Sequence, residues 1–320
     1  MPAVILLAVV LTLSAPVWVP TAALADLVRG RLRLPVLRLM LFAVWWAWAE
    51  TCGIIVLGAI WAVGRAGSTT PQYRLQRWWC FWIISALKGS VGMRLDVTLP
   101  AAVPDKPLVV LCRHASLADS IISCYVVNNK MHLDPRYVLK SDLMNVPCLD
   151  ILGHRTPNCL VTRGTDSPED EAAAVARMAT GMVAGDAAVI FPEGSRASDA
   201  KRTRELERMA GRNPERHGRL SALTHLIPPK TGGVQALLDA SPDADVMTVW
   251  HHGLDGMDTF GGILRGLRSG RPRVHVVAEI HDRSTVPGND SLAGWLDNQW
   301  LRIDAEVAAH SARTGMTGAF

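Results

Sequence analysis

The sequence predicts an α/β protein: a largely parallel sheet flanked by helices, preceded by an N-terminal α-helical membrane module. Two observations lead to this prediction. Residues 1–65 are mostly apolar, whereas from Leu99 onward short apolar runs alternate with amphipathic stretches. Such alternation is typical of a parallel sheet covered by helices. We therefore expect membrane-embedded helices in residues 1–65, an interfacial amphipathic segment in 66–97 and the α/β domain in 98–320.

The first apolar stretch extends from Val4 to Ala25 and is long enough for a membrane span of about 20 residues. Pro16 and Pro20 are expected to kink it. No Lys or Arg precedes the stretch, whereas a signal peptide normally begins with positive charge. We therefore favour a span over a cleaved signal peptide.

A second apolar stretch, Leu39 to Val63, carries Glu50 near its middle. It forms either a second span, with Glu50 facing a partner helix, or a re-entrant hairpin that turns near residues 50–53. A carboxylate on a spanning helix in mid-bilayer is costly, so we favour the hairpin. The link between the two stretches is basic, which places it in the cytosol by the positive-inside rule. Its arginines are Arg29, Arg31, Arg33 and Arg38.

The segment from Arg74 to Val91 combines basic residues with a Trp-rich apolar run. Trp favours membrane interfaces, where the ring is buried and the N–H stays hydrated. This composition predicts a helix that lies at the interface. The alternative is an ordinary core helix.

The α/β domain is predicted from the apolar periodicity that follows. The expected strands are Leu108–Cys112, Tyr137–Lys140, Cys159–Thr162, Ala187–Phe191, Val246–Trp250 and Val274–Ile280. The expected helices are Leu117–Asn129, Pro168–Ala184, Gly233–Ala240, Phe260–Leu267 and Leu292–His310. The Arg-rich residues 197–218 are expected to form an exposed helix or loop.

Charge and cysteine content exclude some classes of function. The net charge is only +4 and there is no dense Lys/Arg block, so we predict no nucleic-acid binding. None of the six cysteines has C-x-x-C spacing, so neither a zinc motif nor a redox motif is predicted. Their apolar surroundings indicate reduced, buried thiols.

The segment R-H-A-S-L-A-D, residues 113–119, follows an expected strand and opens an expected helix. His114 is expected in the turn and Asp119 in the first turn of the helix. The Asp119 carboxylate can then reach back to the imidazole, fix its tautomer and stabilise the imidazolium. No neighbouring Ser or Cys is an obvious covalent nucleophile, so His114 is expected to act as a general base on a substrate hydroxyl.

A second segment, V-I-F-P-E-G-S-R at residues 189–196, places a polar turn after another expected strand. Gly194 permits close approach of the backbone to a ligand. Arg196 offers a planar fork suited to phosphate. Taken alone, the segment also has the composition of a plain polar turn.

The pair H-x-x-x-x-D and F-P-E-G-S-R resembles the glycerolipid acyltransferase superfamily, which includes lysophosphatidate and glycerol-phosphate acyltransferases. An Arg-containing block at 160–164 and a Pro-containing block at 226–233 lie in the order of that family, and the resemblance covers roughly residues 108–237. Two positions depart from the usual pattern: Gly164 follows Arg163, and Ser195 stands where Thr is frequent. These departures leave the identity of the acceptor open.

The resemblance implies roles for individual residues. His114 is similar to the general base and Asp119 to its partner. The implied substrate-binding residues are Arg163, Glu193, Gly194, Ser195, Arg196, Pro228, Pro229 and Lys230. The implied reaction is acyl transfer from acyl-CoA, or another acyl thioester, to a lysophospholipid, first of all lysophosphatidate. Glycerol-3-phosphate or a lysocardiolipin-like lipid is the alternative acceptor, and no metal or cofactor is implied.

The resemblance also bears on location and partners. Acyl-CoA is cytosolic, so we expect the catalytic domain on the cytoplasmic face of a membrane, which the hairpin allows. Membrane lipids are expected partners, and the oligomeric state is not predicted.

A competing hypothesis is a metal-dependent membrane hydrolase that uses His114, Asp119 and the pair His251-His252. Adjacent residues on a strand point to opposite faces, so we expect a polar core histidine instead of a shared metal ion. A non-catalytic membrane scaffold is the third hypothesis, and the intact His114/Asp119 pair argues against it.

Overall fold

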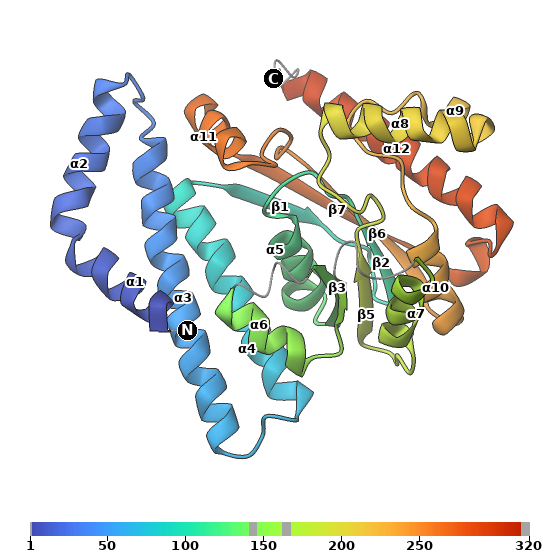
Figure 1. The fold of residues 1–320 in the computed structure, drawn as a ribbon, viewed down its shortest axis with the longest axis horizontal. Coiled ribbons are helices and arrows are strands. Elements are labelled where there is room, and N and C mark those ends of the chain that lie inside the picture. The colour runs from blue at the N-terminus through green and yellow to red at the C-terminus, as the bar shows by residue number, and fades with distance from the viewer. Residues whose placement is uncertain (1, 141–145, 162–167, 315–320) are drawn as a thin grey trace.

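A mostly parallel sheet forms the centre of the molecule in the computed structural model, which describes residues 2–140, 146–161 and 168–314 (Figure 1). Within these residues the sheet has seven strands in the order β1-β7-β6-β2-β5-β3-β4. All neighbours are parallel except β6 and β7, so the predicted fold class is confirmed. The strands are β1 (Arg94–Thr98), β2 (Leu108–Cys112), β3 (Asp134–Lys140), β4 (Cys159–Val161), β5 (Asp186–Ile190), β6 (Asp245–His252) and β7 (Arg273–His281).

Helices precede the sheet and then alternate with its strands. Those before the sheet are α1 (Pro2–Leu13), α2 (Ala15–Val28), α3 (Pro35–Ala62) and α4 (Thr69–Ala86), which a π-helical turn extends (Leu87–Val91). Those in the α/β domain are α5 (Asp119–Cys124) with a π-helical extension (Tyr125–Lys130), α6 (Pro147–Arg155), α7 (Pro168–Ala179), α8 (Asp199–Arg212), α9 (Pro214–Leu220), α10 (Gly232–Ala240), α11 (Phe260–Ser269) and α12 (Asp290–Thr314). In Figure 1, α1 to α3 lie at one side of the sheet, away from α8, α9 and α12.

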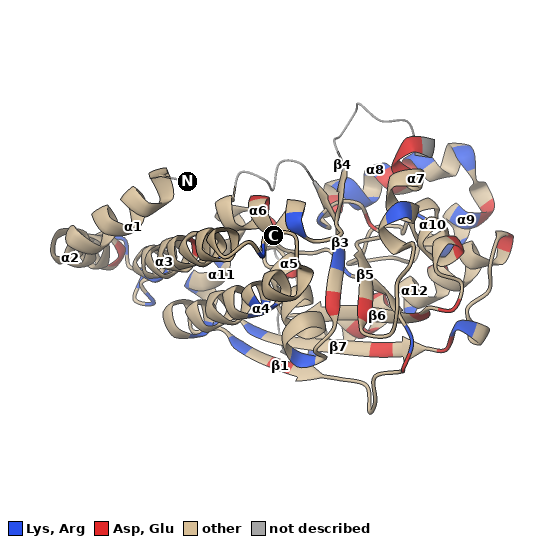
Figure 2. Cartoon of the chain, turned by 90° about the horizontal axis from the view of Figure 1, so that it is seen from below, with Lys and Arg blue, Asp and Glu red and all other residues tan. Residues whose placement is uncertain are grey.

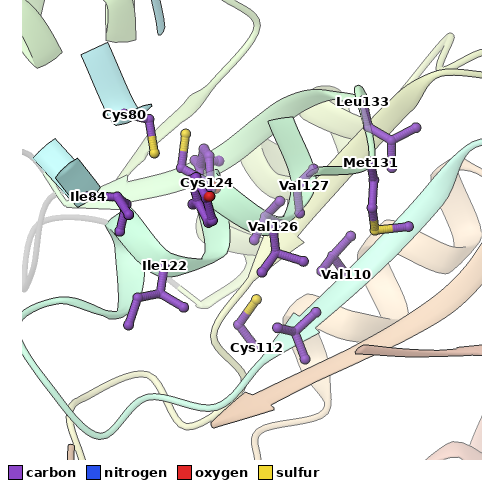
Figure 3. Packing of buried hydrophobic residues seen from close by; sticks show 14 of the residues in the cluster. Cys80, Ile84, Val110, Cys112, Ile122, Cys124, Val126, Val127, Met131 and Leu133 are labelled. Carbon is purple, nitrogen blue, oxygen red and sulfur yellow. The ribbon is translucent and has the colours of Figure 1, made fainter. Parts of the chain in front are cut away.

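Both faces of the sheet are covered, and strand β2 shows why. Its five residues are all buried, and successive side chains point to opposite faces. Val110 and Cys112 belong to the hydrophobic cluster that contains parts of α4, α5 and the π-helical extension of α5, where Figure 3 shows them near Val126. Val109 and Leu111 belong to a second cluster, with residues of α7, α10 and α12. A strand buried on both faces accounts for the continuous apolar run in the sequence.

The sequence-based elements agree with the structure in most places. Each predicted strand overlaps an observed one, and residues 197–218 form the mostly exposed helices α8 and α9. The helix predicted from Leu117 begins at Asp119, because the preceding residues form the turn that carries His114. Strand β1 was not predicted, because its exposed edge alternates Arg94, Asp96 and Thr98 with half-buried residues. The short helix α6 was also missed.

The first apolar stretch is bent, as its prolines predicted. Helices α1 and α2 meet at Ser14 with a bend of 75°. Pro16 lies in the first turn of α2, where a residue without a backbone N–H is tolerated. Pro20 lies inside the same helix.

The second apolar stretch differs from the favoured prediction. Helix α3 is continuous from Pro35 to Ala62, so the hairpin turn expected near residues 50–53 is wrong. Glu50 is fully buried, and its carboxylate accepts hydrogen bonds from Trp79 Nε1 and Cys148 N, both at 2.9 Å. These contacts satisfy the carboxylate inside the protein, so a turn is not needed to remove it from lipid.

Helix α4 is a core helix on one side and exposes aromatic side chains on the other, and its position at a membrane interface stays a prediction. Trp79, Cys80 and Ile83 are buried in the core, whereas Phe81 and Trp82 are exposed on the other side of the helix. Among the described residues, α3 is long and apolar enough to cross a membrane, and the bent pair α1–α2 qualifies as one broken span.

Candidate active site

Three chain segments meet at one edge of the sheet because β2 is hydrogen-bonded to both β5 and β6 in parallel. The carboxyl ends of parallel strands lie at the same edge, which is where ligands bind in open α/β sheets. The turn after β2 carries His114, the turn after β5 carries residues 192–197, and β6 ends in His251 and His252. The topology thus brings together motifs that are far apart in the sequence.

His114 and Asp119 form the hydrogen-bonded pair that their spacing predicted. The distance from His114 Nδ1 to Asp119 Oδ2 is 3.0 Å. The same oxygen accepts from the backbone N–H groups of Ala115 (2.5 Å) and Ser116 (2.7 Å), and the Ser116 hydroxyl donates to Oδ1. These donors fix the carboxylate at the N-terminal end of α5.

Asp119 is held in its ionised form. Burial alone would raise its pKa, but His251 and the hydrogen bonds from His114 and His251 outweigh burial and hold the pKa well below its usual range. An ionised Asp119 accepts from Nδ1–H of His114, which leaves Nε2 with its lone pair. The His114 side chain is 16% exposed and packs on Phe191 at 4.6 Å between ring centroids. Its ring is therefore oriented by Asp119 and Phe191 and remains accessible.

Glu193 connects two loops of the site. Its oxygens accept from His114 N at 2.8 Å and from Ile227 N at 3.2 Å. Burial raises the pKa of Glu193 to about 8, against the opposing effects of these amides and of Arg113. Ala197 N also donates to His114 O at 2.7 Å. The F-P-E-G-S-R turn therefore holds the backbone around His114 from two sides, and the Glu193 carboxyl points toward amides.

The cations of this turn are less restrained. Gly194 has φ +68°, and a Cβ at this position would lie 3.2 Å from Lys230 Nζ. Lys230 is exposed, while its backbone N–H donates to Pro192 O at 2.8 Å. Arg196 is half-buried, and among the described residues no hydrogen bond or ion pair involves its guanidinium. Two cations beside the same turn are thus available to an anionic ligand.

The remaining predicted residues lie around this turn or outside the described part of the chain. Ser195 is half-buried beside Gly194, and Pro228 and Pro229 are buried. Pro229 O accepts from Arg216 Nη2 at 2.7 Å, so the Pro-containing block is packed against α9. Arg163 follows strand β4 and lies outside the described residues.

His251 is a component of the site whose role the sequence did not indicate. Its Nε2 lies 2.9 Å from Asp119 Oδ1, so one carboxylate is shared by two imidazoles. His252 points to the opposite face and stacks on His310 at 4.5 Å, as strand geometry predicted. Within the described chain, no group of three or more His, Cys, Asp or Glu residues is arranged to hold a metal ion.

A buried ion pair lies behind these histidines. The guanidinium of Arg113 is fully buried, is paired with Asp255 and donates to His251 O at 2.5 Å. Although burial lowers the pKa of Arg113, Asp255 outweighs it and the pKa is raised. Arg113 therefore keeps its charge and connects the turn after β2 to the end of β6.

The fold and these paired loops define a class of α/β enzyme with a histidine–carboxylate pair at the edge of its sheet. Residues 94–252 match the sequence profile of the Acyltransferase family. These residues form an acyltransferase domain, and the match confirms the glycerolipid acyltransferase superfamily that the motifs predicted.

A solved structure has a similar fold. It is the 1-acyl-sn-glycerophosphate (LPA) acyltransferase PlsC from Thermotoga maritima, with a TM-score of 0.54 and 14% sequence identity. The match covers 86% of this chain and 97% of that chain. A comparison with curated protein sequences gave no match.

Proposed function

We propose that this protein transfers an acyl group from acyl-CoA to the free hydroxyl of a lysophospholipid, with lysophosphatidate as the first candidate. The observation that carries the proposal is the hydrogen bond between His114 and Asp119 next to a turn with two available cations. The similar fold from Thermotoga maritima is that of a 1-acyl-sn-glycerophosphate acyltransferase, which supports this choice of acceptor.

His114 acts as the general base. Its Nε2 removes the proton from the acceptor hydroxyl while the oxygen attacks the carbonyl carbon of the thioester. The C–S bond then breaks, the thiolate leaves and the imidazolium returns the proton to sulfur. Asp119 stabilises the imidazolium in between, so the acyl group passes directly to the acceptor without an acyl-enzyme.

The acceptor phosphate binds at the turn after β5. Arg196 offers two parallel N–H donors and Lys230 a point charge, and Gly194 lets the phosphate approach the backbone. Arg163 is a further phosphate ligand in this proposal. Glu193 does not bind the phosphate in this proposal. Its carboxyl group holds the His114 turn in position, and it would repel phosphate when ionised.

The N-terminal helices hold the enzyme at a membrane. Large apolar side chains are exposed along them, including Leu13, Val17, Ile55 and Trp61. In Figure 2, α1 to α3 are almost entirely free of charged residues, whereas charges are frequent on the α/β domain. A membrane-bound enzyme reaches a lipid acceptor in the bilayer. Because Arg33 of the basic link contacts Arg268 of the α/β domain, the positive-inside rule supports a cytoplasmic position for both, without the hairpin, and a cytoplasmic catalytic domain reaches acyl-CoA.

The test is an assay of the purified full chain in detergent with oleoyl-CoA and a panel of acceptors. The panel contains lysophosphatidate, other lysophospholipids, lysocardiolipin and glycerol-3-phosphate, and the release of free CoA is followed. Lysophosphatidate-dependent release is expected. Preference for glycerol-3-phosphate or lysocardiolipin would change the acceptor and retain the reaction class.

His114→Ala is assayed in parallel with His154→Ala as the matched control. His154 is an exposed residue of α6 that lies beside Asp150 of the same helix. His114→Ala is expected to lower kcat by about 10²–10⁴-fold, while His154→Ala keeps full activity. Equal activity of the two variants would rule out His114 as the base.

A further inference from the structure

A second cationic site lies where the link between α2 and α3 meets α11. A cavity of about 410 Å³ is lined by the link between α2 and α3 and by Arg268 near the C-terminal end of α11. Figure 1 shows α11 near the top of α3, where this link is located. The link contributes Arg29, Arg31 and Arg33 to the lining, and we call this cavity the arginine pocket.

The charges of the arginine pocket are poorly neutralised by the protein. Within the described chain, one ion pair forms there, Arg31 with Asp26 at 3.7 Å. One oxygen of the Asp26 carboxylate, Oδ2, accepts from the backbone N–H groups of Val36 (2.8 Å) and Leu37 (3.2 Å), so Oδ1 alone faces Arg31. Arg33 Nη1 donates to the neutral carbonyl oxygen of Arg268 at 3.2 Å. The pocket therefore keeps a net positive charge.

Further guanidinium groups lie next to the pocket. Arg38, on the first turns of α3, is close enough to Arg33 and Arg271 for their charges to interact. Both Arg38 and Arg271 lie near Gly92, because a Cβ added there would be 3.1 Å from Arg38 Nη2 and 3.2 Å from Arg271 Cδ. Arg38 Nη2 is buried without a hydrogen-bond partner. These groups repel one another, so an anion at this place would stabilise the arrangement.

The surroundings of the pocket identify the kind of anion. Three large apolar side chains at the end of α2 and in the link are exposed: Leu27 (49%), Val28 (78%) and Leu32 (81%). Apolar residues next to arginines are typical of the level of lipid head groups, where acyl chains and phosphates are both within reach. A free phosphate would use the arginines and leave these apolar residues in water.

We infer that the arginine pocket binds the phosphate of an anionic membrane phospholipid, at a site separate from the acceptor phosphate site at Arg196. The planar guanidinium groups of Arg33 and Arg268 provide paired N–H donors for phosphate oxygens. The inference does not depend on the identity of the acceptor.

Binding there would fix the orientation of the active site relative to the bilayer. Helix α11 has ten residues and is therefore about 15 Å long. It carries Arg268 near one end, and the loop before its other end contains Asp255, the partner of Arg113, and Met257, whose carbonyl oxygen accepts from Leu117 N. A head group held at Arg268 is thus connected to the His114 turn by one helix and one loop.

The experiment measures thermal unfolding of the detergent-solubilised full chain by tryptophan fluorescence. Dioctanoyl-phosphatidylglycerol, dioctanoyl-phosphatidylcholine or inorganic phosphate is added at equal concentration. A ligand of the folded state raises Tm, here by about 2–4 °C for phosphatidylglycerol. Phosphatidylcholine and inorganic phosphate are expected to change Tm by less than half of that. An equal shift with inorganic phosphate would overturn the assignment to a lipid.

Variants locate the effect. The double variant Arg33→Gln/Arg268→Gln is expected to lose the Tm shift caused by phosphatidylglycerol. The control Arg204→Gln/Arg212→Gln, on the exposed helix α8, removes the same amount of charge and is expected to retain the Tm shift. The single variant Arg268→Gln, at an exposed position, replaces the double variant if the latter fails to fold. Arg196→Gln tests whether the lipid occupies the acceptor site instead. An unchanged shift in the pocket variants, or its loss in Arg196→Gln, would refute the inference.

Discussion

The active site and the arginine pocket are both rich in charge, but they treat charge in opposite ways. Asp119 is buried and its oxygens accept five hydrogen bonds from named donors, and Arg113 is paired with Asp255. In the arginine pocket, cations lie close together and, among the described residues, the single carboxylate of Asp26 pairs with one of them. The first arrangement is complete without a ligand, and the second is not.

The difference separates a preorganised catalytic group from a site that waits for a counter-ion. Fixed partners around Asp119 and His114 avoid reorganisation during the reaction, which is the main source of electrostatic catalysis. Unneutralised arginines at the end of apolar helices gain most from an external anion. Substitutions at His114 or Asp119 should therefore lower kcat. Substitutions at the cations Arg196 and Lys230, which are unpaired among the described residues, should weaken binding of the acceptor.

The largest effect is expected for Asp119→Asn. Asparagine keeps the size of the side chain but replaces one oxygen by an amide N–H₂, where two or three of the five donors point, so His114 loses its tautomer and orientation. We expect kcat to fall by about 10²–10⁴-fold. The measurement is CoA release at saturating substrates, with Asp150→Asn, whose side chain on α6 is partly exposed, as the control. A loss of less than threefold would contradict the preorganised His114/Asp119 pair.

A smaller effect, on binding, is expected for Arg196→Ala. Since the guanidinium has no partner among the described residues, its removal should leave the fold intact and raise KM for a phosphorylated acceptor by about 10–100-fold, the range for one charge-assisted contact. Both kcat and KM for acyl-CoA should change little. Lys230→Ala should act in the same direction, more weakly. A similar loss with monoacylglycerol, which has no phosphate, would contradict the phosphate role.

The shared carboxylate makes His251 a positioning residue. In His251→Ala, Asp119 loses one donor, so more of its negative charge acts on His114 and favours the imidazolium. We expect kcat to fall by about 5–30-fold and the acid limb of the pH–rate profile to move to higher pH. His251→Gln, which can still donate, should restore part of both. An unchanged pH profile would reduce His251 to a packing role.

The smallest change is expected in the pH dependence of stability in Glu193→Gln. The Glu193 carboxyl has a pKa of 4.5 in the unfolded chain and of about 8 in the folded one, so between these values the folded state binds the extra proton. Stability from this group therefore decreases as pH rises through the window, by at most about 1.4 kcal/mol per pH unit. The variant should show a flatter dependence of Tm on pH between 5 and 8. Parallel curves for wild type and variant would show that Glu193 does not titrate there.

The sequence alone determined the local features of this protein. Apolar periodicity located the central strands, since buried runs such as Leu108–Cys112 are visible without any partner. The spacing of His114 and Asp119 predicted their contact, because both residues belong to one turn and the helix after it. The order of four motifs predicted the superfamily that the profile match supports.

The tertiary structure decided what depends on partners far away in the chain. The buried carboxylate of Glu50 is satisfied inside the protein because the backbone N–H of Cys148, 98 residues away, donates to it. His251 reaches Asp119 across 132 residues, and Arg33 reaches Arg268 across 235. Periodicity reports only which face of an element is apolar, whereas these contacts follow from the order of the strands and the docking of helices. The sequence therefore identified His114 as the candidate base. Only the tertiary structure brought the imidazole of His251 to Asp119 and formed the arginine pocket.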